Sequence, residues 1–438
     1  MAAPACFVFN RVFLDESFMK FRITPALFKE AETVLAQVLR FDRPADAVLS
    51  HYFRLHRQLG HADRGFVAET VFAFLRRRRS LEAVCSAQPD HRQRLLATLV
   101  LERGYGEADL HAVLKAGEGE WLATLSGQSR AELPPAVRCD LPDWLYERLR
   151  AQRGEDAVDA LAAALNRPAP LDLRVNSLRS TRDEVLQQLA ASSLAATAGR
   201  LSPLAVRLRG KPALARHPLF LSGDIEVQDE GSQLLGLLLE ARRGEMVADF
   251  CAGAGGKTLL LGAQMRNTGR LYAFDVSEKR LAKLKPRLAR SGLSNVHPVR
   301  IEHERDTKIK RLAGKMDRVL VDAPCSGLGT LRRNPDLKWR QNAEAIDELT
   351  VKQASILAAA ATLVRPGGRL VYATCSLLAD ENEQIVQDFL ARQPDFTLLP
   401  AGDILARQGI DLSGELLHLQ PDVHDTDGFF AAVLERRQ

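Results

Sequence analysis

The feature that most constrains the fold of this chain is a change of hydrophobic pattern near residue 225. From there onward, short apolar runs rich in β-branched and aromatic residues alternate with segments of helical periodicity. The predicted strands cover residues 247–250, 271–276, 296–301, 318–321, 369–374 and 429–434. This alternation is typical of a doubly wound α/β fold, in which helices cover both faces of a mostly parallel sheet. Ligands bind such sheets at the carboxyl ends of the strands, so motifs at those ends are the candidates for chemistry.

Two further regions precede this sheet. Helical spacing is found at residues 25–39, 45–59, 63–78 and 92–103, and one more helix is predicted from 143 to about 165. Asp63 is the expected N-cap of its helix. Strand-like runs at 171–176 and 205–208 flank a predicted helix at 181–191. We therefore divide the chain into an all-helical domain (1–165), a small basic α/β subdomain (166–224) and a large α/β domain (225–438).

Composition excludes disorder and membrane spans as the main state of the chain. Of its 438 residues, 46% are hydrophobic and 26% charged, which is close to the globular average. The longest run without charge or strong polarity, 356–364, is about half of the roughly 20 residues that cross a bilayer. The first residues lack the pattern of a secretory signal. We expect a cytoplasmic protein without membrane association.

Positive charge is concentrated in two segments. Residues 166–220 carry 9 Lys and Arg against 3 Asp and Glu, and residues 279–340 carry 17 against 6. Residues 341–438, in contrast, carry 7 against 15. Two basic segments are what a partner with a phosphate backbone requires, but solvated helix faces explain the same charge equally well.

A glycine-rich turn follows the first predicted strand of the large domain. Residues 251–258 read Cys-Ala-Gly-Ala-Gly-Gly-Lys-Thr and lead into a helix. The glycines let the backbone approach a ligand, and the N-terminus of the helix offers free amide groups. The Walker A loop requires glycine in place of Cys251, and the dinucleotide fingerprint requires glycine in place of Thr258. Both phosphate-binding motifs therefore fail at a required position.

The second predicted strand ends at Asp275, 22 residues beyond Gly253. A carboxylate at this place can accept both hydroxyls of a ribose. The turn and the carboxylate together fit an adenosine whose tail is an amino acid, and S-adenosylmethionine is that ligand. Two structural explanations stay open: an ordinary tight turn for the glycines and a helix cap for Asp275, although Ser277 is better placed as the cap.

Cysteines at two strand ends are the other candidates for chemistry. Asp322 and Cys325 follow the fourth predicted strand, and Cys375 follows the fifth. The six cysteines form no C-x-x-C pair, which argues against disulfides and structural zinc. Three others are expected to be small buried apolar residues, namely Cys6, Cys85 and Cys139.

Thiols at these ends suit methylation of a pyrimidine ring. Carbon 5 is a poor nucleophile until a thiolate adds to carbon 6 and converts the ring to an enamine. An acid at N3 relieves the developing negative charge, and Asp322 can do so if burial raises its pKa. A base must then remove the carbon-5 proton, a task open to the second cysteine or to a water that it positions. Spacing alone does not decide which cysteine attacks.

With these motifs in place, the chain resembles the Sun/RsmB/NOP family of RNA cytosine-5 methyltransferases. The resemblance rests on residues 173–176, 227–230, 249–258, 322–327, 332–339, 372–376 and 427–430, and it covers residues 170–438. It implies a Rossmann-like methyltransferase sheet preceded by a small RNA-binding insert. The first 165 residues resemble, more weakly, the helical NusB-like domain of bacterial members.

The resemblance also implies roles for individual residues. Cys375 is then the nucleophile and Cys325 assists release, while Asp322 keeps the role of acid at N3 that the chemistry suggests. The expected cofactor contacts are Cys251, Ala252, Gly253, Ala254, Gly255, Gly256, Lys257, Asp275, Asp306 and Asp322. The expected RNA contacts are Arg174, Asn176, Arg332, Arg333 and Lys338. The chain departs from the family pattern at Ala254, where proline is usual, and Asp306 is our choice among several acidic residues after the third strand.

The function predicted from the sequence is transfer of a methyl group from S-adenosylmethionine to carbon 5 of a cytosine, in small-subunit ribosomal RNA. We expect RNA as the partner, no metal and a monomer. A transfer RNA methyltransferase is one alternative. A catalytically silent RNA-binding assembly factor is another, and retention of Cys325, Cys375 and Asp322 argues against it.

Overall fold

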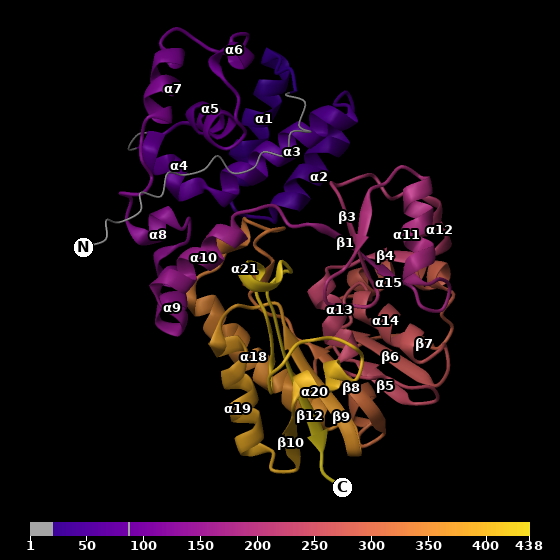
Figure 1. Ribbon diagram of the computed structural model, residues 1–438. Coiled ribbons are helices and arrows are strands. Elements are labelled where there is room, and N and C mark those ends of the chain that lie inside the picture. Colours follow the sequence, from indigo (N-terminus) through magenta and orange to yellow (C-terminus); the bar gives the residue numbers. More distant parts are fainter. Residues whose placement is uncertain (1–20, 86–87) are drawn as a thin grey trace, which may run out of the picture. The chain divides into compact units, whose positions relative to one another are not determined.

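The computed structural model describes residues 21–85 and 88–438, and these form two compact units with a boundary between Arg138 and Cys139. The first unit is helical throughout its described residues (Figure 1). Its helices are α1 (Pro25–Val38), α2 (Ala45–Leu55), α3 (His61–Arg76), α4 (Arg78–Cys85), α5 (His91–Leu101), α6 (Glu107–Leu110), α7 (Glu118–Ser126) and α8 (Pro135–Arg138). Helices α1, α3 and α5 pack against one another through buried apolar side chains, as their periodicity predicts.

One local prediction in this unit is wrong. Asp63 is not the N-cap of α3, because the helix begins earlier and its N-cap is Gly60. Asp63 lies in the first turn instead, where its carboxylate accepts a hydrogen bond from the Gly60 amide at 2.9 Å. Cys85 and, in the second unit, Cys139 are buried, as predicted. The Cys139 thiol also donates a hydrogen bond to the Asp159 carboxylate at 3.0 Å. Cys6 lies outside the described residues.

The second unit begins with a helical pair and a small antiparallel sheet. The helices are α9 (Asp143–Arg153) and α10 (Glu155–Leu165), and Gly154, with φ +83°, interrupts the single helix that the sequence predicts. The small sheet contains β1 (Leu171–Val175), β2 (Ala196–Ala198), β3 (Ala205–Leu208) and β4 (Ile225–Val227), in the order β2-β3-β1-β4, with helices α11 (Arg182–Ala191) and α12 (Pro218–Ser222). Thr181 caps α11 through a reciprocal bond with Glu184.

The rest of the unit is a large mixed sheet in the order β10-β12-β9-β8-β5-β6-β7, with β11 paired to β12. Its strands are β5 (Met246–Asp249), β6 (Arg270–Asp275), β7 (Val296–Arg300), β8 (Met316–Asp322), β9 (Val364–Thr374), β10 (Phe396–Leu399), β11 (Leu417–Leu419) and β12 (Phe429–Arg436). Strands β7, β6, β5, β8 and β9 are parallel, and β12 is antiparallel to β9, β10 and β11. All six predicted strands are present, and β10 and β11 are additional.

Helices cover both faces of this sheet (Figure 1). The helices of this region are α13 (Glu230–Leu237), α14 (Gly256–Gln264), α15 (Glu278–Ser291), α16 (Thr307–Lys310), α17 (Leu337–Arg340), α18 (Ala343–Ala361), α19 (Glu383–Arg392), α20 (Ala401–Ala406) and α21 (Pro421–His424), with short 3₁₀ turns η1 (Leu328–Thr330) and η2 (Ala379–Glu381). Successive strand residues alternate between the faces: Val247 and Leu320 pack with α13 and α14, whereas Ala248 and Val321 pack on the side of α18 and α19. This alternation confirms the doubly wound sheet.

The topology brings the predicted motifs to one edge. Strand β5 lies between β6 and β8, so the chain order reverses there, and open α/β sheets bind ligands at such a reversal. The glycine turn after β5, Asp275 at the end of β6, Cys325 after β8 and Cys375 after β9 all follow the carboxyl ends of adjacent parallel strands. Within residues 21–85 and 88–438, no helix has the length and apolar character needed to span a bilayer.

Candidate active site

The glycine turn has the backbone geometry that a bound cofactor needs. Gly253 and Gly255 have φ of +57° and +84°, a region that favours glycine. A Cβ on Gly255 would lie 2.1 Å from Leu284 of α15, so this glycine permits close packing of the turn. A Cβ on Gly253 would meet nothing within 4 Å, so this side of the turn is open to a ligand. Gly255 caps α14 without a side-chain hydrogen bond, which leaves first-turn amides for an anionic group.

Asp275 fixes the turn from the neighbouring strand. Its side chain is buried, and its carboxylate accepts hydrogen bonds from the Gly253 amide at 2.8 Å and the Ser277 amide at 2.7 Å. Ser277, as expected, caps α15 by accepting from the Arg280 amide at 3.3 Å. The carboxylate therefore orders the glycine turn, and its contact with a ribose stays a prediction.

A buried carboxyl beneath the turn escaped the sequence analysis. Asp249 ends β5 and is 1% exposed. One of its oxygens accepts from the Thr258 hydroxyl at 2.7 Å, and the other has no hydrogen-bond partner among the residues that the structure describes. Burial raises the pKa of Asp249 to about 7. Burial also raises the pKa of the neighbouring Cys251 thiol, so Cys251 stays protonated. The signal in the sequence was an aspartate at the end of an apolar strand just before the glycines.

Lys257 and Asp322 form an ion pair across the site. The Lys257 ammonium donates to the Asp322 carboxylate at 2.7 Å. Burial opposes the charge of Lys257, but the attraction of Asp322 outweighs it and the pKa of Lys257 is raised. The Asp322 side chain is 32% exposed. The expectation that Asp322 is a buried acid is therefore wrong, because it lies at the rim of the sheet with a cationic partner.

The two cysteines at the strand ends meet. Their Sγ atoms are 3.3 Å apart, and the Cys375 amide donates to Cys325 Sγ at 3.3 Å. Both side chains are half-buried. The hydrogen bond with the Cys375 side chain, followed by burial, raises the pKa of Cys325 well above its ordinary value. Cys325 is therefore held as a thiol beside Cys375.

The structure contradicts the prediction that Arg174 and Asn176 contact RNA. Arg174 is 3% exposed and donates to Gln228 and to the Gly256 carbonyl, the latter at 2.5 Å. Burial lowers its pKa to about 10. Asn176 is also buried. Its side-chain amide donates to two backbone carbonyls, that of Gly223 after α12 at 2.9 Å and that of Ser291 at the end of α15 at 3.1 Å. Both side chains join the small sheet to helices of the large domain, Arg174 to α14 and Asn176 to α15, so they are not available to a phosphate.

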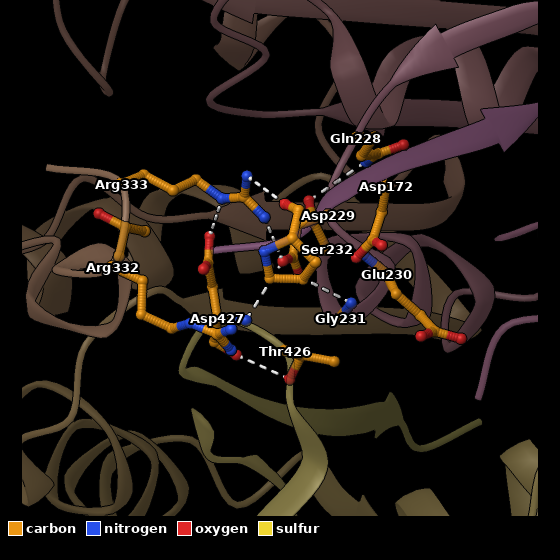
Figure 2. A network of polar contacts seen from close by, with 12 residues as sticks. Asp172, Gln228, Asp229, Glu230, Gly231, Ser232, Arg332, Arg333, Thr426 and Asp427 are labelled. Carbon is orange, nitrogen blue, oxygen red and sulfur yellow. Dashed lines mark hydrogen bonds and ion pairs between the residues drawn. The ribbon is translucent and has the colours of Figure 1, made fainter. Parts of the chain in front are cut away.

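The three downstream cations are likewise engaged inside the protein. Figure 2 shows Arg333 between Asp229 and Asp427, with N–O distances of 2.8 and 2.6 Å. Arg332 is buried and forms an ion pair with Asp425 at 2.9 Å. These expected RNA contacts are therefore corrected to internal ion pairs. We call Asp229, Arg332, Arg333, Asp425 and Asp427 the junction.

Lys338, in the same segment, is also buried and bonded within the protein. It is 1% exposed, and its ammonium donates to the Asn166 side chain at 2.9 Å. Within the junction, burial and the neighbouring charge of Asp229 raise the pKa of Asp427 to about 7. Since none of these acidic partners is near the basic residues in sequence, only the fold could reveal the pairing.

Asp306 has a structural role that the sequence did not suggest. It is the N-cap of α16, and its carboxylate accepts from the Lys308 and Glu302 amides, each at 2.9 Å. These backbone hydrogen bonds lower its pKa. The cap accounts for Asp306 without a ligand, and its contact with an adenine stays a prediction.

Comparison with known proteins identifies the family. A sequence model of the family described as 16S rRNA methyltransferase RsmB/F matches residues 236–435, and the ferredoxin-like domain of RsmF/B-like methyltransferases matches residues 141–214. The chain is 32% identical, over 92% of its length and 98% of the other protein, to a probable ribosomal RNA small subunit methyltransferase B from Synechocystis. The chain belongs to the RsmB/F family of ribosomal RNA methyltransferases.

Solved structures agree with this family and its fold. The crystal structure of PH0851 covers 95% of this chain with a TM-score of 0.77 at 26% identity, and all of PH0851 is matched. A methyltransferase homologue from Pyrococcus horikoshii covers 70%, at 32% identity and a TM-score of 0.60, and is also matched in full. The Rossmann-like sheet, the small α/β insert and the family predicted from the sequence are confirmed. This RsmB/F methyltransferase acts on RNA, and its cofactor is S-adenosylmethionine.

Proposed function

We propose that this RsmB/F protein methylates carbon 5 of a cytosine in small-subunit ribosomal RNA, with Cys375 as the nucleophile and Cys325 as the residue that assists release. The observation that carries the proposal is the pair of sulfurs 3.3 Å apart on the strand edge of the glycine turn. Attack on carbon 6 of a pyrimidine requires a thiol, whereas methylation of an amine does not. The small-subunit target is supported by relatives named ribosomal RNA small subunit methyltransferase B.

In the first step, the thiolate of Cys375 adds to carbon 6 of the cytosine. A carbon–sulfur bond forms, and the ring electrons move toward carbon 5 and N3, where a proton is taken up. The Lys257 ammonium nitrogen lies 2.7 Å from the Asp322 carboxylate, so Lys257 can pass a proton to Asp322 as Asp322 protonates N3. The charge of a Cys375 thiolate is among the groups that raise the pKa of Lys257.

Bound at the glycine turn, S-adenosylmethionine supplies the methyl group that carbon 5 accepts. The residues that would hold it are those of 251–257, with Asp275 and Asp322 at its sides. The open side of Gly253 and the free amides of α14 support this fit. The contact of Asp306 with the adenine remains part of the proposal.

Release requires loss of the carbon-5 proton, cleavage of the carbon–sulfur bond and return of the N3 proton through Asp322 to Lys257. The raised pKa of Cys325 keeps it as a thiol, which favours water oriented by Cys325 as the base. The bonding electrons return to Cys375 as a thiolate, which the Cys325 thiol stabilises as a hydrogen-bond donor across 3.3 Å. The two sulfurs thus have opposite tasks, one reactive and one protonated.

RNA binding is reassigned to exposed cations. Lys279, Lys283 and Lys285 are exposed on α15, the helix that follows the strand ending at Asp275. Leu281 and Leu284 are buried and anchor this helix in the core. These lysines are proposed as phosphate contacts beside the reactive edge.

The proposed organisation keeps a helical domain, a basic subdomain and a catalytic domain (225–438), but the limit between the first two, set at 165 from the sequence, lies earlier. The family match of the ferredoxin-like domain, from residue 141 to 214, is evidence for moving the first limit toward 140. A monomeric enzyme remains part of the proposal.

The test is bisulfite sequencing of ribosomal RNA from cells with and without the gene. One small-subunit cytosine is expected to lose its 5-methyl group when the gene is absent, and Cys375→Ala should not restore it. Cys325→Ala should accumulate a covalent protein–RNA adduct on a denaturing gel. Unchanged methylation without the gene, or full activity of Cys375→Ala, would contradict the proposal.

A further inference from the structure

A buried carboxylate links the two cysteine loops. Glu381 lies in η2 and is 0% exposed. One of its oxygens accepts from the Ser326 amide at 2.8 Å and the Gln353 side chain at 2.9 Å. The other accepts from the hydroxyls of Ser326, at 2.5 Å, and Ser376. A single side chain therefore receives four hydrogen bonds from three segments of the chain.

The positions of the two serines make this carboxylate relevant to the chemistry. Ser326 directly follows Cys325, and Ser376 directly follows Cys375. Gln353 adds a second connection to the first loop, because its amide also donates to the carbonyl of Pro324 at 3.0 Å. The contacts of Glu381 thus fix the loop of each cysteine relative to the other.

The neighbouring residue holds only one of the two loops. The Asn382 side chain accepts from the Thr374 hydroxyl at 2.5 Å and donates to the Ser376 carbonyl at 3.2 Å. These two contacts lie on either side of Cys375. Asn382 therefore positions Cys375, whereas Glu381 positions both cysteines.

The chemistry of the group explains why a carboxylate stands here. An ionised carboxylate is an acceptor only and can receive about four hydrogen bonds, whereas an amide side chain replaces half of those acceptors with donors. None of the four donors to Glu381 is a cation. A buried carboxylate without a cationic partner is expensive for stability alone. Three of its four neutral donor groups belong to Ser326 and Ser376 in the two reactive loops, and the fourth is the Gln353 side chain of α18.

We propose that Glu381 and Asn382 are positioning residues that set the spacing of the Cys325 and Cys375 sulfurs, with Glu381 coupling attack to release. This inference rests on the proposed cytosine-5 chemistry. Neither residue touches the substrate in this scheme. A displacement of about 1 Å at a reacting group is enough to lower a rate by roughly 100-fold, so a loosened loop should affect the chemical steps more than binding.

Two single substitutions separate the two loops. Ser326→Ala loosens the Cys325 loop and is expected to slow release, so the fraction of enzyme trapped as the RNA adduct should rise as kcat falls by about 10-fold or more. Asn382→Ala loosens only the Cys375 loop and should lower kcat to a similar degree without raising the adduct fraction. Both should leave KM for RNA and for S-adenosylmethionine within about two-fold of the unaltered enzyme.

A third substitution tests the carboxylate itself. Glu381→Gln keeps the shape but places donors opposite the serine hydroxyls, so it should lower kcat and raise the adduct fraction, with less effect than Glu381→Ala. Glu245→Gln is the matched control, since Glu245 is a shielded carboxylate paired with Arg318 at 3.2 Å near the start of β5. It should lower the melting temperature without changing the adduct fraction.

The outcomes distinguish this inference from the proposed function. If the unaltered enzyme forms no 5-methylcytosine, the proposed function fails. If it does, and Cys325→Ala traps the adduct, the inference fails alone when Ser326→Ala and Asn382→Ala keep kcat and the unaltered adduct fraction. It also fails if Ser326→Ala and Asn382→Ala each change kcat, KM and melting temperature together. Such a joint change would mean that the two substitutions act through a general loss of stability.

Discussion

Helix α15 and the loop that carries Arg332 and Arg333 belong to the same basic segment, yet the structure uses their charges in opposite ways. The lysines of α15 are exposed, whereas the two arginines are held by Asp229, Asp425 and Asp427 (Figure 2). Two of these three aspartates come from the acidic segment 341–438, far along the chain. A count of charges therefore locates basic sequence, but only the fold decides whether a cation faces solvent or an internal acid.

The comparison predicts its largest effect on stability at Arg333. Removal of the guanidinium in Arg333→Ala leaves two buried carboxylates, Asp229 and Asp427, without their shared partner, and such a loss costs about 3–5 kcal/mol. Urea unfolding should show this decrease in the free energy of unfolding. Arg333→Lys should recover part of it only, because an ammonium lacks the planar fork that bridges two carboxylates. A loss below about 1 kcal/mol would place Arg333 with the exposed cations.

The pH dependence of stability tests the same junction. Burial raises the pKa of Asp427 to about 7 in the folded protein, above the value of about 3.9 for a free aspartate. Between these two values the folded state binds the extra proton, so stability contributed by protonated Asp427 is lost as pH rises toward 7. The asparagine in Asp427→Asn cannot titrate. As pH rises from 5 to 8, the free energy of unfolding of this variant should therefore increase by roughly 1–3 kcal/mol relative to that of the unaltered protein. A difference between the two proteins that stays constant over this range would contradict the raised pKa.

How much was visible in the sequence differs between the sheet and its polar contacts. The strands β5, β6, β8, β9 and β12 could be predicted because burial on both faces leaves continuous apolar runs. The mostly exposed edge strand β7 followed from its place in the alternation of strands and helices. The strands β10 and β11 were missed. Strand β5 is as short as β10, but β5 is almost wholly buried and leads into the glycine turn, whereas β10 is only partly buried. The boundary near Cys139 was missed because α9 and α10 have the same helical pattern as the first unit.

The candidate site divides in the same way. The glycine turn, Cys325 and Cys375 could be found because each is a local motif at the end of a predicted strand. Glu381 could not, because its importance lies in contacts with Ser326, 55 residues away in sequence. Arg333 was misassigned for the related reason that its partners lie outside its own segment.

Substitutions on α15 test the exposed side of the comparison. Replacing Lys279, Lys283 and Lys285 together by alanine should weaken RNA binding by roughly 10-fold at moderate salt and reduce the slope of log affinity against log salt by about 2–3. The free energy of unfolding should change by less than about 0.5 kcal/mol, since the three lysine side chains are exposed. Fluorescence anisotropy with a ribosomal RNA fragment at several salt concentrations measures both quantities. Lys352→Ala on α18 is the control, and an equal loss there would indicate non-specific attraction.

The smallest effect is expected at the outer edge of the junction. Asp425 pairs with Arg332 at 2.9 Å and with Arg207 at 2.6 Å, but its side chain is 50% exposed, so solvent screens both pairs. Its φ of +55° makes asparagine the suitable replacement, because asparagine tolerates this region and alanine does not. Asp425→Asn should lower the free energy of unfolding by about 0–1 kcal/mol, a loss that added salt should reduce in the unaltered protein. Asp422→Asn on the exposed face of α21 is the control. A loss at Asp425 as large as that of Arg333→Ala would mean that the junction behaves as one cooperative network, in which exposure of a member does not reduce its contribution.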